Sequence, residues 1–244
     1  FHMNDSGVYI TPASRGASHT STALARLDEN GAASYTFDLE WAPTAPIEVP
    51  PTAQIIEAGS ISAIIEPGAS AVLDALARGR EHALICFDPN ARPSIMGEPS
   101  AALASLERFV ALADVIKVSD EDIDWLTGGA PIDEVVDRWL GMGVSLVVVT
   151  RGKHGSEVTM ASGLRFTKTP SDVEVVDTVG AGDSFMGGMI DAMWGMGLRG
   201  ADAREALRTL PEEQIRAIID RASAVSDVTV SRKGANPPWA HELS

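Results

Sequence analysis

Four short apolar segments, the first three each followed by a segment with helical spacing, constrain the fold of this chain more than any other feature. The segments at 54–58, 83–87, 115–118 and 146–150 are predicted to be buried strands. The last is continuous, apolar and β-branched, which is typical of a central parallel strand. Amphipathic segments such as 100–113 alternate with them. This alternation predicts an α/β fold in which helices cover both faces of a mostly parallel sheet.

The N-terminal part of the chain does not share this alternation. Its predicted short strands are 8–10, 22–27 and 33–39. The sequence at 28–31 indicates a hairpin turn between the last two strands. Several prolines then indicate a linker: Pro43, Pro46, Pro50 and Pro51. We therefore expect residues 1–52 to form a separate N-terminal region with a small β lid, and residues 53–244 to form the α/β core.

The remaining predicted elements complete the core. The expected helices are 66–76, 120–126, 132–140, 182–196 and 211–225. The segments 157–160 and 164–167 are predicted to pair as a hairpin, because Ser162 and Gly163 separate them. The first seven residues resemble a helix end capped at Gly7, which leads us to expect that the fold begins earlier than this chain.

The charge balance and the cysteine count argue against several kinds of partner and of metal site. The 244 residues carry 19 Lys and Arg against 34 Asp and Glu, which gives a formal net charge of −15. Such a chain repels a polyanion, so we expect no nucleic-acid partner. It has no long apolar run or signal-peptide pattern, so we expect no membrane partner. The single Cys86 and the scattered histidines disfavour disulfides and zinc sites and fit a cytoplasmic location.

The segment 175–185 carries the clearest chemical signal. It is predicted to form a strand, a glycine-rich turn and the start of a helix. Gly180 and Gly182 allow the backbone to approach a ligand closely, and the N–H groups of a helix start attract an anion. Asp183 at the same place is suited to accept the proton of an attacking hydroxyl, as phosphoryl transfer requires. The alternative is that Asp183 only caps the helix.

Other nucleotide-binding motifs fail at this segment. The dinucleotide fingerprint requires a third glycine where Phe185 stands. The chain contains no P-loop sequence and no set of protein-kinase motifs. The glycine-rich turn is therefore interpreted as an anion site of another kind.

Four segments in order resemble the ribokinase (PfkB) family of carbohydrate kinases. Residues 177–183 resemble the C-terminal signature of that family. Residues 88–93 are similar to a stretch found in its fructokinases and ketodeoxygluconate kinases, and 150–155 resemble its nucleotide-binding turn. Residues 231–235 resemble the loop that closes over the nucleotide and a monovalent cation. The resemblance implies a ribokinase-like three-layer α/β/α sandwich with a β lid.

The resemblance also implies catalytic and substrate-binding residues. Asp183 would be the catalytic base, and the backbone N–H groups of the anion hole would come from Gly180, Ala181 and Gly182. Asn90 and Arg92 would face the sugar or the transferred phosphoryl group. A turn that merely ends the strand is the alternative interpretation of residues 88–90.

Nucleotide and cation sites are implied in the same way. Thr150 and Gly152 would contact the nucleotide, although a plain strand-to-turn junction would look the same. Asp177, Val179 and Gly234 would hold a cation such as K⁺ through a carboxylate and carbonyl groups. The alternative is that Asp177 only orders the loop by accepting hydrogen bonds.

Two departures from the family pattern stand out. Ser119 and Asp122 occupy the positions of a family motif, Asn-x-x-Glu, that serves Mg²⁺ and phosphate, so they are weaker candidates for that role. A solvated acidic helix start is the alternative. The family's N-terminal strand, with its acidic sugar-binding residue and Gly-Gly segment, has no counterpart here. We therefore expect about the first quarter of the family fold to be missing.

The resemblance implies an ATP-dependent sugar kinase that uses Mg²⁺, with fructose as the preferred acceptor. The alternatives are a 2-keto-3-deoxygluconate kinase, a ribokinase, or a family member that binds nucleotide or sugar without turnover. Lid sheets in this family often pair between subunits, so a homodimer through the lid is one expected arrangement.

Overall fold

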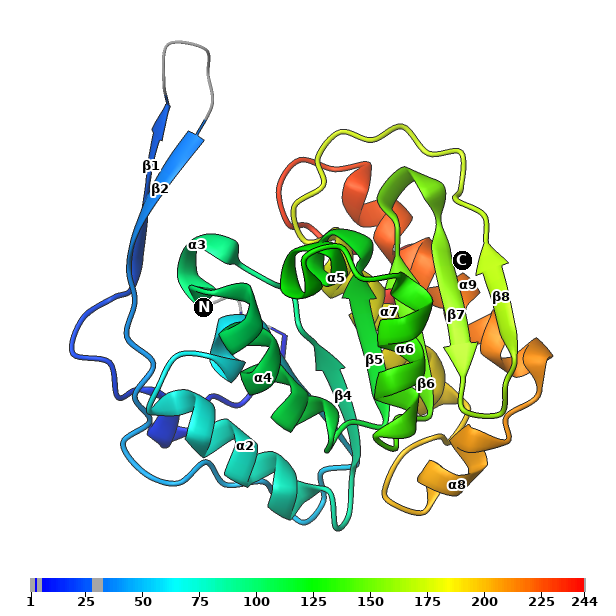
Figure 1. The fold of residues 1–244 in the computed structure, drawn as a ribbon, viewed down its shortest axis with the longest axis horizontal. Helices are drawn as coiled ribbons and strands as arrows, with labels where there is room; N and C mark the ends of the chain where they lie inside the picture. Colours follow the sequence, from blue (N-terminus) through cyan, green and yellow to red (C-terminus); the bar gives the residue numbers. More distant parts are fainter. Residues whose placement is uncertain (1–2, 4–5, 28–32, 244) are drawn as a thin grey trace.

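A six-stranded sheet forms the centre of the molecule. The computed structural model describes all residues except 1–2, 4–5, 28–32 and 244. The strands, in both chain and spatial order, are β3 (Ile55–Gly59), β4 (Leu84–Asp88), β5 (Val115–Ser119), β6 (Leu146–Thr150), β7 (Ser156–Met160) and β8 (Arg165–Lys168). The first four are parallel, and the last two are antiparallel additions (Figure 1). The mostly parallel sheet predicted from the sequence is confirmed.

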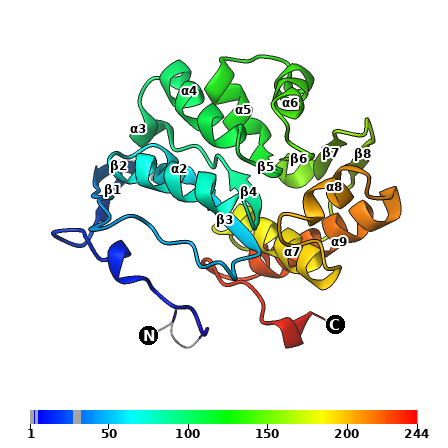
Figure 2. The same cartoon turned by 90° about the horizontal axis from the view of Figure 1, so that it is seen from below.

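Helices cover both faces of this sheet, as Figure 2 shows. One face carries α2 (Gly68–Gly79), α3 (Pro93–Met96), α4 (Pro99–Val110), α5 (Asp120–Thr127) and α6 (Ile132–Gly141). The other carries α7 (Ala181–Gly195), α8 (Ala203–Arg208) and α9 (Glu212–Val230). Alternate strand residues divide between two cores: Ile85 and Phe87 pack toward α4, whereas Cys86 packs toward α7 and α9. The three-layer α/β/α prediction is confirmed.

A two-stranded antiparallel ribbon projects from the body of the molecule (Figure 1). It consists of β1 (Thr22–Leu27) and β2 (Ala33–Asp38), in agreement with the predicted lid strands. The predicted turn at 28–31 lies outside the described residues. The predicted strand at 8–10 is wrong, since these residues pair with no strand among the described ones and their side chains are exposed. The division into 1–52 and 53–244 stays a prediction.

The predicted helix end at the start of the chain lies only partly within the described residues. Gly7 has a φ of 72°, and the Val8 N–H donates to the Met3 carbonyl at 2.9 Å. A bond of this span together with a left-handed glycine is typical of a helix C-terminus.

The segment before the glycine-rich turn differs from the prediction. Val175 and Val176 form no strand, and more than half of each side chain is exposed. The N–H groups of Val176 and Asp177 both donate to the carbonyl of Val230, at the end of α9. Because none of the described strands lies beside them, these β-branched residues do not enter a ladder. Helices α3 and α8 were also not predicted. Among the described helices, none is long and apolar enough to span a membrane.

Candidate active site

Three strands of the sheet bring charged side chains to the face covered by α7. Glu57 of β3 pairs in register with Cys86, whose side chain packs among α7 and α9 residues. Asp88 and Lys117 follow on the same face of β4 and β5 by the two-residue alternation of strands. The carboxyl ends of parallel strands are where open α/β sheets bind ligands. The same edge receives the N-terminus of α7.

The turn that begins α7 requires glycine at its first position. Gly180 has a φ of 79°, a left-handed conformation that side chains rarely adopt. A Cβ on Gly180 would lie 2.9 Å from the Cβ of Ala235. The Ala181 N–H already donates to the Thr178 carbonyl at 3.2 Å. Of the predicted anion hole, the N–H groups of Gly180 and Gly182 have no partner among the described residues.

We expect Gly180→Ala to lower the free energy of unfolding by about 1–3 kcal/mol, because alanine is strained at this φ and contacts Ala235 too closely. The matched control is Gly187→Ala in the same helix, where a Cβ would meet nothing within 4 Å. That control should be neutral or raise stability by about 0.5–1 kcal/mol. Urea unfolding of both variants is the measurement, and equal effects would contradict the assignment.

Asp183 lies one residue beyond this turn and contacts the loop after β4. The Asn90 amide donates from Nδ2 to Asp183 Oδ1 at 3.2 Å. Arg92 Nη1 donates to Asn90 Oδ1 at 2.7 Å, so Asn90 is fixed between the two charged groups. Asn90 itself has a φ of 38°, and Ser60 Oγ donates to its carbonyl at 3.2 Å. The structure therefore brings together the predicted base and both predicted substrate-binding residues.

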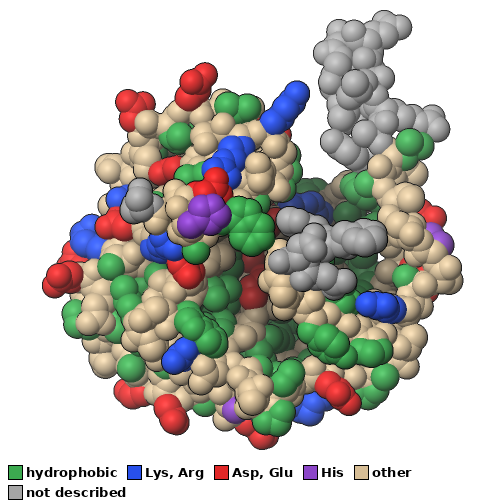
Figure 3. All heavy atoms as spheres, turned by 180° about the vertical axis from the view of Figure 1, so that it is seen from behind, with side chains coloured by type: hydrophobic (Ala, Val, Ile, Leu, Met, Phe, Trp, Pro, Cys, Tyr) green, Lys and Arg blue, Asp and Glu red, His purple; other side chains and the backbone are tan. Residues whose placement is uncertain are grey.

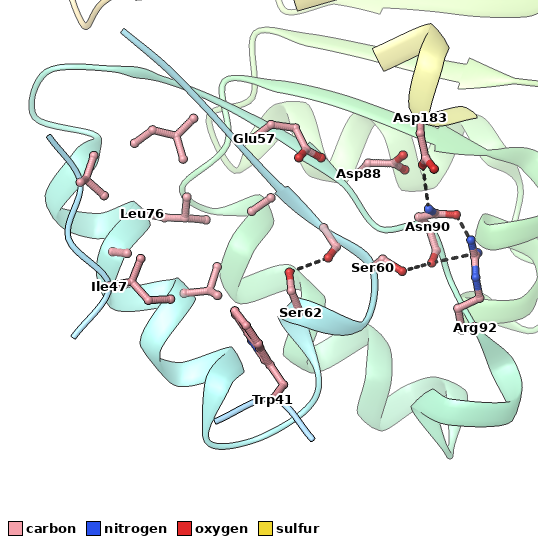
Figure 4. A pocket seen from close by; sticks show the side chains of 16 residues that line it. Trp41, Ile47, Glu57, Ser60, Ser62, Leu76, Asp88, Asn90, Arg92 and Asp183 are labelled. Carbon is pink, nitrogen blue, oxygen red and sulfur yellow. Dashed lines mark hydrogen bonds between the residues drawn. The ribbon is translucent and has the colours of Figure 1, made fainter. Parts of the chain in front are cut away.

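A pocket of about 610 Å³ opens beside Asp183. Figure 4 shows the carboxylates of Glu57, Asp88 and Asp183 directed toward its same end, next to Asn90 and Arg92. The opposite wall is mostly apolar: Trp41, Ile47, Val49, Ile56, Val72, Ala75 and Leu76. A pocket with apolar walls and a few converging polar groups is typical of a small-molecule site. The face in Figure 3 mixes acidic and basic side chains and shows no broad basic patch.

A buried ion pair lies behind the pocket. Lys117 Nζ is 2.5 Å from Asp88 Oδ2, and the two side chains are 4% and 5% exposed. A Cβ on Gly182 would lie 2.8 Å from Lys117 Nζ, so the ammonium group lies directly against the α7 turn. Asp88 Oδ1 is buried without a hydrogen-bond partner among the described residues. Burial raises the pKa of Asp88 to about 6, although Lys117 opposes the rise.

Glu57 completes this charged group. Its side chain keeps contact with solvent through the pocket, yet partial burial raises its pKa to about 7. The negative charges of Asp88 and Asp183 add to the rise, and Lys117 opposes it. Glu57, Asp88 and Lys117 were not assigned to the site from the sequence. Their signal was a charged residue inside an otherwise apolar strand (Glu57 and Lys117) or directly at its end (Asp88), which the apolar pattern obscured.

Ser119 and Asp122 form a helix cap behind Asn90. Ser119 Oγ accepts from the Asp122 N–H at 3.0 Å, and Asp122 Oδ2 accepts from the Ser119 N–H at 3.2 Å. Asp122 Oδ1 accepts from the Ala91 N–H at 2.9 Å and so holds the loop that carries Asn90. Both oxygens are engaged with backbone groups, which favours the helix-start alternative. A contact with Mg²⁺ or phosphate stays a prediction.

Thr150 and Gly152 lie at the end of β6 and do not line the pocket that contains Asp183. Thr150 Oγ1 donates to the Val118 carbonyl at 3.4 Å, and Gly152 turns the chain with a φ of 49°. They share the carboxyl edge of the sheet with Asp88, two strands away. Their nucleotide contact stays a prediction.

Asp177, Val179 and Gly234 converge as predicted. Asp177 Oδ1 accepts from the Val179 N–H at 3.0 Å, and Oδ2 accepts from the Gly234 N–H at 2.8 Å. These backbone bonds hold the pKa of Asp177 below its usual value. The carboxylate thus orders the loop, and its role toward a cation stays a prediction. Within the described parts of the chain, no three His, Cys, Asp or Glu side chains cluster as a metal site.

Comparison with known proteins extends the assignment. Residues 1–242 match the family described as pfkB family carbohydrate kinase. Probable fructokinase-4 of Arabidopsis thaliana is 34% identical over 194 residues, which cover 78% of this chain and 56% of that protein. Fructokinase of Rhizobium leguminosarum bv. trifolii is 36% identical over 174 residues, which cover 67% of this chain and 52% of that protein. The chain thus spans a little over half the length of these two relatives.

A solved structure shares the fold. The crystal structure of fructokinase from Vibrio cholerae O395, in a form with fructose, ADP and calcium ion bound, superposes with a TM-score of 0.73 at 26% sequence identity. The match covers 96% of this chain and 75% of that one. The described fold therefore accounts for nearly all of this chain in terms of one known architecture.

Proposed function

Because the chain belongs to the pfkB family of carbohydrate kinases, we propose that it takes part in ATP-dependent phosphorylation of a sugar hydroxyl, with fructose as the acceptor. The observation that carries the proposal is the hydrogen bond from Asn90 to Asp183. It lies beside the N-terminus of α7, at the end of the pocket that Glu57 and Asp88 also line. The fructose and ADP bound to the Vibrio cholerae fructokinase support the choice of acceptor and nucleotide.

The proposed reaction assigns a step to each of these groups. Asp183 accepts the proton of the sugar hydroxyl as its oxygen attacks the γ-phosphorus. A new O–P bond forms, the bond to the bridging oxygen breaks, and ADP leaves with that oxygen. The free N–H groups at Gly180 and Gly182 stabilise the charge on the transferred group. Asn90 and Arg92 hold Asp183 and the acceptor in line.

The remaining assignments complete the proposal. Mg²⁺ bound to ATP would neutralise phosphate charge, held mainly through the phosphates because the described residues offer no cluster of three ligands. Asp177, with the carbonyl groups of Val179 and Gly234, is assigned to a K⁺-like cation. The nucleotide with its Mg²⁺ is assigned to Thr150, Gly152, Ser119 and Asp122.

We place the protein in the cytoplasm, assign residues 1–52 to the lid region and 53–244 to the core, and propose pairing of lids in a homodimer.

A chain with a net charge of −15 repels ATP at long range. Local donors and the positive end of α7 therefore have to supply the attraction. Lys117 adds one positive charge against this turn. The names of the relatives do not favour 2-keto-3-deoxygluconate, ribose or a non-catalytic role over fructose.

The proposal is tested by an acceptor panel. In a coupled assay of ADP formation with MgATP, we expect fructose to give the highest kcat/KM, at least about tenfold above ribose and 2-keto-3-deoxygluconate, a margin that corresponds to about 1.4 kcal/mol. A mixture without sugar is the control for simple ATP hydrolysis. A clear preference for a sugar acid or a nucleoside would contradict the choice of acceptor, and no turnover with any sugar would contradict the kinase proposal.

A further inference from the structure

Glu57 is placed to contact the acceptor. It lies in the middle of β3, which is one of the two edge strands of the described sheet. Its side chain lines the pocket and points toward Asp88 and Asp183 (Figure 4). The strand continues through Gly59, where a Cβ would lie 2.0 Å from the Asp88 carbonyl, so β3 and β4 are held in close register at this edge. The backbone of Glu57 therefore has a fixed position in the pocket wall.

The part of the pocket wall formed by Glu57 and Asp88 offers hydrogen-bond acceptors that no donor in the described part of the chain satisfies. The side chain of Glu57, which is exposed to the pocket, has no hydrogen-bond or ion-pair partner among the described residues. Asp88 Oδ1 also lacks a partner, although Asp88 is 3% exposed and lines the same pocket. Lys117 is occupied by the other oxygen of Asp88. Buried polar atoms without a partner are uncommon, so a ligand that donates to Asp88 Oδ1 is the expected complement, and the exposed Glu57 carboxylate beside it can accept from the same ligand.

The charges identify the class of that ligand. Three carboxylates face this end of the pocket, and the nearest ammonium group, Lys117, is already paired. Arg92 Nη1 donates to Asn90 Oδ1 and to the Ala91 carbonyl at 2.8 Å; both acceptors are neutral, so Arg92 keeps its positive charge, on the far side of Asn90 from Glu57 (Figure 4). An anionic group placed beside Glu57 would be repelled. A neutral polyhydroxyl compound supplies donors without charge, so this wall favours a neutral sugar over a sugar acid.

We propose that Glu57 is a specificity-determining residue whose carboxyl group accepts a hydrogen bond from a second hydroxyl of the acceptor sugar, with Asp88 Oδ1 as its neighbour, while the reacting hydroxyl faces Asp183. The assignment rests on the proposed kinase function. It predicts that loss of the Glu57 carboxylate weakens sugar binding and leaves the chemical step largely intact.

Glu57→Gln keeps the size of the side chain and removes its charge. We expect the KM for fructose to rise about tenfold with kcat changed by less than about threefold, since one charge-assisted hydrogen bond is weakened. Glu81→Gln, an exposed site outside the pocket, is the matched control and should change neither constant. Calorimetric titration of fructose without nucleotide should show the same tenfold loss. Glu57→Asp serves as a second variant, with a carboxylate drawn back from the ligand.

The pH dependence of KM gives a readout that a structural role would not move. Glu57 faces Asp88 from β4, Lys117 from β5 and Asp183 from α7, and Cys86 is its neighbour in register. Because the raised pKa leaves Glu57 largely protonated at pH 6 and ionised at pH 8, the KM for fructose should fall as pH rises across this range. In Glu57→Gln this fall should be lost, apart from any change near pH 6 due to Asp88.

Deoxyfructose analogues, each lacking one hydroxyl, identify the contact. Removal of the hydroxyl that binds Glu57 should raise the KM of the parent for the sugar. In Glu57→Gln, where this contact is already weakened, the same removal should raise KM little further. If the parent phosphorylates fructose but Glu57→Gln keeps its KM within twofold and its pH profile, the inference is overturned and the proposed function stands. If the parent phosphorylates no sugar, the proposed function fails and this inference fails with it.

Discussion

Replacement of Asp183 by asparagine is expected to lower kcat for sugar phosphorylation by about 10²–10⁴-fold, the usual contribution of a positioned general base. Asparagine has nearly the same shape, and its Oδ1 can still accept the hydrogen bond that Asn90 donates at 3.2 Å. What it loses is the capacity to take a proton. Because the N-terminus of α7 remains in place, nucleotide affinity should change by less than about threefold, as no phosphate contact is removed.

The matched control lies two turns further along the same helix. Asp191 is exposed and accepts from Arg221 Nε at 2.8 Å, away from the pocket. Asp191→Asn should leave kcat unchanged and shift stability by no more than about 0.5 kcal/mol. ADP release with and without sugar measures the chemical step, and calorimetric titration measures ATP binding. Sugar-dependent activity of Asp183→Asn within tenfold of the parent would refute the assignment of the catalytic base.

The parallel strands of the core could be predicted because each apolar run is short and because helical spacing follows the first three of them. The interval 146–150 coincides with β6, and the other parallel strands differ by one or two residues at their ends. The same rule failed at Val175 and Val176, whose β-branched side chains suit a strand but pair with none of the strands in the described part of the chain. Helix α3, at only four residues, is too short to show a helical period.

The residues of the site can also be divided into those that the sequence predicted and those that it did not. The turn around Gly180 and the acid Asp183 could be predicted because their local sequence carries the chemistry. Glu57, Asp88 and Lys117 become one group only through the register of β3, β4 and β5, which no local pattern specifies. The resemblance to a known family also placed residues in order along the chain. It could not show that the oxygens of Asp122 are already used by backbone N–H groups.

The largest stability effect is expected from Lys117→Met, which should lower the free energy of unfolding by about 3–5 kcal/mol near neutral pH. The reason is that Asp88 would remain buried with neither oxygen paired. Lys168→Met is the matched control, because Lys168 forms an exposed ion pair with Asp220 at 2.5 Å. Such surface pairs contribute about 0–1 kcal/mol. Urea unfolding of both variants compares the two losses.

The loss of unfolding free energy in Lys117→Met should depend on pH in a defined direction. The folded-state pKa of Asp88 is about 6 and lies above its ordinary value, so the folded state binds this proton more tightly than the unfolded state. Stability from this group is therefore greatest below about pH 4 and declines as pH rises through about 6. Loss of Lys117 raises that pKa further, because an opposing positive charge is removed. The deficit of Lys117→Met should accordingly be smaller at pH 5 than at pH 8.

A double variant separates the unpaired charge from the lost packing. In Asp88→Asn combined with Lys117→Met no charge is buried, so most of the lost stability should return, as the cycle of single and double variants would show. If the double variant is instead as unstable as Lys117→Met, the loss comes from the lysine stem against β5 and α7 and not from Asp88. In that case the ion pair would not be what holds the α7 turn at the carboxyl edge, and the closeness of Lys117 Nζ to Gly182 would reflect packing alone.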